Sequence, residues 1–382
     1  MEHIMFTAMK RYLILLAAVA LLAACNKDND EVQSPTQSTT PKRLASLTSI
    51  SYSQYRSYNY ETGQYELSST SGSKNGATFR WSSSGLLIGM GMEGIGIDGD
   101  LLTIEYDGNK MKNIVINGAA MGASGNVIYS CSYTDDKLTT LYASIPGRGW
   151  SNTTLSYNPN GELISMRELS SDGDVIEVAL VWENGNVIHA QKTYSGAHYS
   201  ETHIETYDYF YDNMSSMFTG IEMYGLIGSS YYMLSRNNVL RVIDNYSNTQ
   251  SDTTIYIYDY DGDWPVSYTT ERGNRNSYDG GDQYEYKAYL RYTDGSGVTA
   301  PQTFTISTSM NLPGIDYDYY IYGGGEYEAG RQVVLRVNSS VTYHGVDRQF
   351  MCWNDGVTDN PRTLTVSGDA QFIAIYENSD NK

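Results

Sequence analysis

The chain has 382 residues, 40% of them hydrophobic, which is enough for one large domain and one small domain because domains typically have about 100 to 200 residues. Its formal net charge is −19 and no stretch gathers Lys and Arg into a cluster, which argues against nucleic acid as a partner. Tyrosine is abundant, with 36 residues against 7 Phe and 5 Trp, and Gly, Ser, Thr and Asn are frequent, so we expect strands and turns rather than helices.

Residues 1–24 have the organisation of a secretory signal peptide. Lys10 and Arg11 give a positive start, and residues 12–23 form an apolar run that is too short to span a bilayer comfortably. Small residues then precede Cys25, in a pattern that resembles the lipobox of bacterial lipoproteins. The resemblance implies cleavage before Cys25 and acylation of its thiol and amine. Since two or more acyl chains anchor a protein stably, we predict Cys25 as a lipidation site, with the membrane as partner through this anchor.

Residues 25–43 are polar, interrupted by proline and without periodicity, which predicts a flexible tether. Asp28, Asp30 and Glu31 follow the anchor closely. They resemble the export signals that send Bacteroidetes lipoproteins to the cell surface. We therefore expect an outer-membrane, lipid-anchored protein that faces outward.

One pattern recurs along the large central region: an aromatic residue, a short turn of Asp, Asn or Gly, and then an apolar residue. Successive copies begin 24 to 29 residues apart, at Tyr106, Tyr133, Tyr157, Trp182 and Tyr211. The spacing predicts β-hairpins closed by the aromatic and the apolar residue, as in Tyr133 with Leu138 or Trp182 with Val187. A single hairpin is barely stable in water, so successive hairpins must pair. We predict an all-β fold, with a large curved antiparallel sheet of successive hairpins, either a meander or barrel-like.

Tyrosines alternate with other residues in several of the expected strands, which places them on one face. The clearest run is Tyr256, Tyr258 and Tyr260, with Ile255 and Ile257 on the opposite face. This tyrosine face could pack against a curved sheet or a covering loop. Alternatively, it could be an exposed platform for sugar rings or a protein partner. For the second possibility, the candidate ligand-binding residues are Tyr256, Tyr258, Tyr260 and Trp264.

The central region contains the segments "KRLASLTSISYSQY", "YNPNGELISM", "WENGNVIHA" and "TIYIYDYDGDWPVSYTT". Together they resemble Bacteroidetes lipoproteins of unknown function that are built from repeats related to Tyr-Asp (YD) repeats, and the similarity extends over residues 44–293. The resemblance implies a cell-envelope address and a β-architecture but no activity. We place this hairpin-repeat domain at residues 44–297.

A Gly/Pro break precedes a second unit at residues 302–378. This unit contains Tyr327, Gly330, Val333, Leu335, Phe350, Trp353, Asp355, Gly356, Asn360, Pro361, Val366 and Tyr376. Together these positions resemble the divergent internalin-type B-repeat. The resemblance implies a small β-grasp-like module that acts as a spacer or an adhesive unit. The polar and aromatic cluster around Cys352 and Trp353 then forms part of the architecture rather than an active site.

Sequence motifs typical of metal sites or of enzyme active sites are weak in this chain. His198 and His203 are five residues apart, which places them on opposite faces of a strand, and no Cys or His has zinc-ligand spacing, so we expect no metal and no cofactor. A pair of acids could serve a hydrolase. However, the chain has 44 Asp and Glu residues, so some pairs will always have a suitable separation, and their number does not indicate an enzyme. Whether Cys131 and Cys352 pair or remain free thiols is left open.

The expected function is therefore non-catalytic binding, adhesion or scaffolding at the cell envelope, with a glycan or protein ligand recognised through exposed aromatic residues. Two alternatives remain. One is a surface glycoside hydrolase or other hydrolase that uses a carboxylate pair, and the other is a purely structural spacer.

Overall fold

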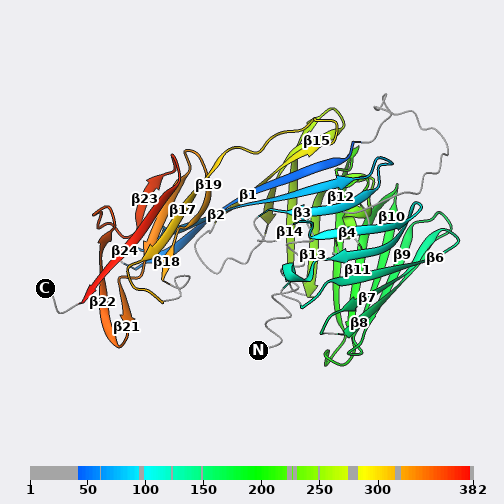
Figure 1. The fold of residues 1–382 in the computed structure, drawn as a ribbon, viewed down its shortest axis with the longest axis horizontal. Helices are drawn as coiled ribbons and strands as arrows, with labels where there is room; N and C mark the ends of the chain where they lie inside the picture. Colours follow the sequence, from blue (N-terminus) through cyan, green and yellow to red (C-terminus); the bar gives the residue numbers. More distant parts are fainter. Residues whose placement is uncertain are drawn as a thin grey trace.

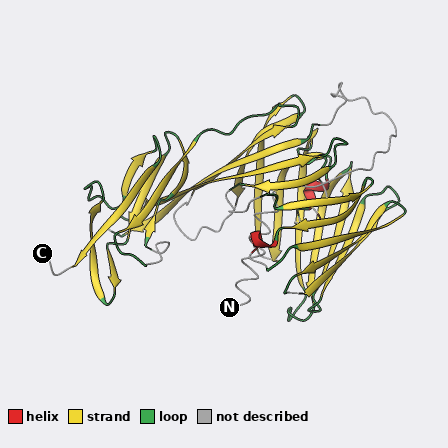
Figure 2. Cartoon of the chain, viewed as in Figure 1, coloured by secondary structure: helices red, strands yellow, loops and turns green. Residues whose placement is uncertain are grey.

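The computed structural model describes residues 42–60, 62–93, 99–121, 124–147, 149–221, 226, 230–247, 250–273, 283–314 and 320–378. The predicted signal peptide, Cys25 and the tether up to residue 41 lie outside these residues. Figure 2 shows that the described regular structure is almost entirely β-strand, with short helical turns beside the strands. The all-β fold class is therefore confirmed.

The first sixteen strands form one antiparallel sheet that closes into a barrel. Each strand pairs with the next along the chain, and β16 returns to pair with β1, where Leu47 lies opposite Leu290. The meander of successive hairpins is thus confirmed in its closed form. The strands are β1 (Leu44–Asn59), β2 (Gln64–Trp81), β3 (Leu87–Met92), β4 (Leu102–Asp107), β5 (Lys110–Ile116), β6 (Val127–Thr134), β7 (Lys137–Ile145), β8 (Gly149–Tyr157), β9 (Leu163–Ser170), β10 (Val175–Glu183), β11 (Asn186–Ser195), β12 (His203–Ser215), β13 (Asn237–Ser247), β14 (Gln250–Asp261), β15 (Trp264–Gly273) and β16 (Gln283–Tyr292).

The hairpin turns follow the spacing of the repeated pattern. Tyr133 lies opposite Leu138 and Trp182 lies opposite Val187, as predicted. In the first turn, Asp135 and Asp136 have φ of 48° and 64°, a left-handed conformation that Asp tolerates better than most residues. The register shifts by one residue at both aromatic positions. Such bulges bend a strand and re-aim its side chains, here beside each repeated ring.

The repeated aromatic residues also tie neighbouring hairpins together. Trp182 donates its indole N–H to the carbonyl of Leu163 at 2.6 Å, and Tyr106 donates its hydroxyl to the carbonyl of Leu87 at 2.8 Å. In each case the acceptor is the first strand residue after an earlier turn. Further bonds of the same kind join Trp81 to Leu44, Tyr211 to Val187, Tyr258 to Val239 and Tyr292 to Pro265. These side-chain to main-chain bonds form a series around the barrel, which the sequence pattern did not predict.

The inside of the barrel is a packed core. In β10, Val178 and Leu180 are buried, whereas Glu177 and Val181 are exposed. A barrel of this many strands is wide, and the connection between β12 and β13 helps to fill it. Its side chains Met217, Phe218, Ile221, Tyr231 and Met233 are buried in the same cluster as the strand residues, and the 3-10 turn η2 (Tyr231–Leu234) is part of it.

The remaining strands form a smaller C-terminal unit with its own apolar cluster. Trp353 is fully buried there and donates its indole N–H to the carbonyl of Asp359 at 3.0 Å. Asp355 accepts two bonds from Arg362, at 2.7 and 2.6 Å. The motif around Cys352 thus belongs to the architecture of this unit. The strands are β17 (Thr303–Met310), β18 (Ile321–Tyr322), β19 (Gly325–Glu328), β20 (Gln332–Val337), β21 (Ser340–Tyr343), β22 (Val346–Trp353), β23 (Arg362–Thr365) and β24 (Ala370–Asn378).

Figure 1 shows β1 and β2 running from the barrel to this C-terminal unit. The two strands pair with each other from Ser46 with Thr78 to Asn59 with Gln64. In contrast, β16 follows β1 only from Leu44 to Gln54, and β3 follows β2 only from Ala77 to Trp81. The distal part of the hairpin therefore leaves the barrel wall. The apolar cluster of the C-terminal unit includes Tyr52 from β1, so this hairpin belongs to both units. The domain boundaries predicted from sequence remain a prediction.

Replacing Tyr106 with Phe tests the bonds between hairpins. The variant leaves the partly buried carbonyl of Leu87 without this donor, and we expect the free energy of unfolding to fall by about 1 to 2 kcal/mol. Urea titration followed by tryptophan fluorescence measures the change. Tyr142→Phe is the matched control, because the Tyr142 hydroxyl has no hydrogen-bond partner within the described residues. Equal stability of the two variants would contradict a stabilising role for the series.

Candidate functional site

The four candidate residues from the sequence lie on the inner side of the barrel. Tyr256, Tyr258 and Tyr260 share one face of β14, as predicted, and Tyr256 and Tyr258 pack against the barrel core. Trp264 is only 8% exposed and packs edge-on against Tyr292. The outer face of β14 instead carries Ile255 and Ile257, both exposed. The alternative considered from the sequence, a tyrosine face that packs against a curved sheet, describes this arrangement.

The tyrosine rings and hydroxyls are engaged within the protein. The rings of Tyr256 and Tyr258 stack with centroids 6.3 Å apart, and Tyr258 lies 5.5 Å from Tyr268. Tyr258 donates to the carbonyl of Val239 at 3.1 Å, and Tyr260 donates to a carboxylate oxygen of Asp212. Burial raises the pKa of the Tyr258 hydroxyl, and the pKa of Tyr260 is raised by burial and then by the Asp212 carboxylate. Ligand binding by these four residues remains a prediction.

A second candidate is a pocket of about 400 Å³ at the junction of the barrel and the C-terminal unit. It is lined by Tyr52, Gln54, Glu328, Ala329, Gly330, Arg331 and Gln332. The lining combines the β1 strand of the barrel with the turn between β19 and β20. Sequence reasoning did not find this site, because no local pattern connects residues nearly 280 positions apart.

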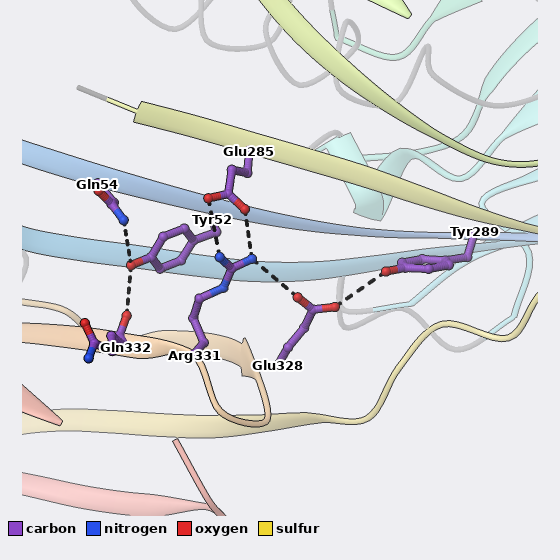
Figure 3. Close-up of polar contacts among 7 residues, drawn as sticks. All are labelled: Tyr52, Gln54, Glu285, Tyr289, Glu328, Arg331 and Gln332. Atoms are coloured by element: carbon purple, nitrogen blue, oxygen red, sulfur yellow. Dashed lines mark hydrogen bonds and ion pairs between the residues drawn. The ribbon is translucent and has the colours of Figure 1, made fainter. Parts of the chain in front are cut away.

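Arg331 is the central side chain of the junction (Figure 3). Its guanidinium group binds Glu285 of β16 through two nitrogen–oxygen contacts of 3.3 and 2.9 Å, and it contacts Glu328 at 3.4 Å. The same group lies 4.3 Å from the centre of the Tyr52 ring, within the range of a cation–π interaction. A two-point Arg–carboxylate contact fixes geometry as well as energy. Arg331 therefore joins one strand of the barrel to the C-terminal unit.

Uncharged contacts extend this junction. Tyr52 donates its hydroxyl to the carbonyl of Gln332 at 2.8 Å, and the main-chain N–H of Val334 donates to the Thr70 hydroxyl at 3.0 Å. Gly72 of β2 pairs with Gly325 of β19. A Cβ atom at Gly72 would lie 2.3 Å from the carbonyl oxygen of Glu326, which no side chain allows. Glycine at this position therefore lets the two backbones approach each other.

The junction suits structural support better than catalysis. Arg331 is already bound by two carboxylates, and the Glu328 carboxylate also accepts a 3.5 Å bond from Tyr289. Burial, followed by the charge of Glu328, raises the pKa of the Tyr289 hydroxyl, which keeps it protonated as a donor. A ligand in the pocket would have to compete with these internal partners.

One group of acids has the character required by the hydrolase alternative. Asp244 lies opposite Tyr207 on β12 and opposite Asp252 on β14. Burial raises the pKa of Asp244 to about 6, and the charges of Glu205 and Asp252 add to the effect. One Asp244 oxygen is buried without a hydrogen-bond partner, whereas Glu205 accepts the hydroxyls of Tyr194 and Tyr207 at 2.7 and 2.9 Å. A carboxyl group with a raised pKa beside a second carboxyl group is a pattern used in acid–base catalysis.

Other chemistry finds little support within the part of the chain that the structure describes. No three His, Cys, Asp or Glu side chains there are arranged to hold a metal ion. His198 and His203 each contact a separate acid, Asp174 and Glu205. Both Cys131 and Cys352 are free thiols, and burial raises the pKa of Cys131 to about 11. Among the described helices, none is both long enough and apolar enough to cross a bilayer.

No model of a known protein family matches the chain, and no curated protein matches it either. Among solved structures, a porin-like protein from Bacteroides uniformis ATCC 8492 is 16% identical, with 66% of this chain and 98% of that chain covered and a TM-score of 0.38. A porin-like protein from Bacteroides vulgatus ATCC 8482 is 12% identical, with 66% and 99% covered and a TM-score of 0.40. Likenesses this remote carry no inference about function. The lipoprotein, YD-repeat and B-repeat resemblances remain predictions.

Arg331→Lys tests the junction. A lysine ammonium cannot reproduce the two-point contact with Glu285, so we expect faster hydrogen exchange in β19 and β20 and on the β1–β2 face beneath them. Mass spectrometry of exchanged peptides provides the measurement. Arg362→Lys is the matched control, because its paired contact with Asp355 lies wholly within the C-terminal unit. Unchanged exchange at the junction in the Arg331 variant would contradict its assigned role.

Asp244→Asn tests the acid group through the pH dependence of stability. The folded pKa of about 6 lies above the ordinary value of 3.8, so the folded state binds more protons and stability falls as pH rises through this window. We expect the variant to gain at most about 2 kcal/mol at pH 8, because partial exposure screens the effect, and almost nothing at pH 4. Thermal unfolding at both pH values measures this. An equal change at pH 4 and pH 8 would show that Asp244 is not the titrating group.

Proposed function

We propose that the chain is an outer-membrane lipoprotein, anchored through Cys25 and displayed at the cell surface, with a non-catalytic role in binding, adhesion or scaffolding. The observation that carries the proposal is the junction. A barrel and a C-terminal unit share the β1–β2 hairpin and are held by paired charges, buried tyrosine and a close glycine contact. Such a body presents its surfaces in a fixed relative orientation.

The distribution of side chains supports a body that stands in water. Outward positions of the barrel include charged groups such as Glu105, Lys112 and Glu177, whereas most inward positions are apolar or tyrosine. A barrel that spans the outer membrane has the opposite arrangement, an apolar outer band around a polar interior. We therefore place the barrel beside the membrane rather than within it, which makes a separate anchor necessary.

The predicted tether fits this placement. Its 18 residues after Cys25 would reach roughly 60 Å when fully extended, and roughly 23 Å as a flexible coil. Either length carries the folded body clear of the lipid headgroups. The ligand would be a glycan or a protein, bound through aromatic side chains. A purely structural spacer is the alternative in which the same rigid body binds no ligand.

A hydrolase is the second candidate, and the Asp244 and Glu205 pair is the observation that favours it. Asp244 would act as the general acid and Glu205 as the second carboxyl group of the pair. Asp244→Asn would then abolish hydrolysis of a polysaccharide panel while leaving polysaccharide binding intact. If the parent protein hydrolyses no polysaccharide, and the Asp244→Asn variant loses only polysaccharide binding, the non-catalytic proposal is favoured.

Replacing Cys25 with Ala tests the anchor and the location together. We expect the variant to leave the membrane fraction and to lose incorporation of a labelled palmitate analogue. In intact cells expressing the parent chain, added protease should remove the folded body while a periplasmic marker survives. Protection of the body until the outer membrane is permeabilised would contradict surface display, and retention of the Cys25 variant in the membrane would contradict lipid anchoring.

A further inference from the structure

An aromatic pair stands on the outer wall of the barrel, on neighbouring strands β7 and β8. Tyr142 and Trp150 are 45% and 37% exposed, whereas Leu141 and Ala143, which flank Tyr142, point into the core. The two ring centroids lie 6.2 Å apart and the ring planes differ by 20°. Two nearly parallel rings at this separation overlap only slightly, so much of each ring face remains open to solvent.

Trp150 differs from the other four tryptophans of the chain. Trp81, Trp182 and Trp353 each donate their indole N–H to a main-chain carbonyl, and Trp264 is buried in the core. Within the described residues, the indole N–H of Trp150 has no hydrogen-bond partner. Trp150 is therefore a large apolar side chain that is exposed to solvent, and its indole N–H is available as a donor.

The described residues directly opposite Tyr142 are small and polar. Asn152 lies directly opposite Tyr142 on β8, and Ser130 lies opposite it on β6. Within the described part of the chain, the Asn152 amide and the Tyr142 hydroxyl also have no hydrogen-bond partner. The charges farther along the wall, Arg167 and Glu177, pair with each other at 3.3 Å.

We infer that Tyr142, Trp150 and Asn152 form a binding platform for a neutral saccharide. A sugar ring has an apolar C–H face that fits an aromatic ring and hydroxyl groups that fit the free indole N–H, amide and phenol. The net charge of −19 disfavours acidic polysaccharides. A protein partner would need about 800 Å² of contact surface, far more than two rings provide. The inference rests on the proposed binding function and assigns it a ligand class.

The test is retention of the purified chain in gels that contain soluble starch, laminarin or mannan, with polygalacturonate and heparin as acidic comparisons. We expect retention by at least one neutral polysaccharide, and at least about tenfold weaker binding by the Tyr142→Ala/Trp150→Ala variant. Tyr246→Ala, which removes another tyrosine that is 40% exposed, is the matched control and should bind normally. No retention by any neutral polysaccharide, or full retention of the double variant, would overturn the platform.

A second measurement, of tryptophan fluorescence quenching, detects saccharide binding in the parent chain itself. Trp150 is the most exposed of the five tryptophans, so it should dominate the fluorescence that acrylamide quenches readily. A bound neutral saccharide should protect this component, which Trp150→Phe should remove. Quenching that is unchanged by saturating saccharide would overturn the inference, as would a protein captured by the parent chain and not by the double variant. Surface location is tested separately by protease shaving, so failure of the platform and failure of the proposed function can be told apart.

Discussion

The β1–β2 hairpin is the element on which the rest of the structure depends. Its proximal half closes the barrel, since β1 receives β16 along ten residue pairs, from Leu44 with Tyr292 to Gln54 with Gln283. Its outer face carries Tyr52, Thr70 and Gly72, which receive the C-terminal unit. Because hydrogen bonds along one strand pair serve both purposes, loosening the hairpin would open the barrel and release the C-terminal unit together. Arg331, held by Glu285 and Glu328, fixes the angle at which the two units meet.

Within the barrel, the same repeated residues perform three tasks. The aromatic residue pairs across its own hairpin, lies beside a bulge and donates a hydrogen bond to an earlier hairpin, as Trp182 does to Leu163. An indole or phenol inside a core needs a partner for its polar atom, and the carbonyl of the earlier hairpin provides it. At Tyr106, Tyr211, Tyr258 and Tyr292, a phenylalanine ring could fill the space but could not make the bond. The interior of the barrel is therefore a packed core.

The parts of the fold that depend on local spacing could be predicted from the sequence. Tyr133 with Leu138 required only a turn of known length, and the alternation of Tyr256, Tyr258 and Tyr260 was enough to place them on one face. The direction of that face was not predictable, because Ile255 and Ile257 make the opposite face apolar as well. Closure of the barrel decides which side is inside. The Arg331–Glu285 contact was missed for a similar reason, since it depends on how two units dock.

If the barrel and the C-terminal unit form one rigid body, their separation is fixed, and a distance measurement tests this most directly. Spin labels at Ser132 on the barrel wall and Thr342 in the C-terminal unit, in a chain with Cys25, Cys131 and Cys352 replaced by Ala, would report the separation of the two units by pulsed electron paramagnetic resonance. The account predicts one narrow distance distribution that agrees with the structure. A broad or two-peaked distribution would show that the two units move independently and would contradict it.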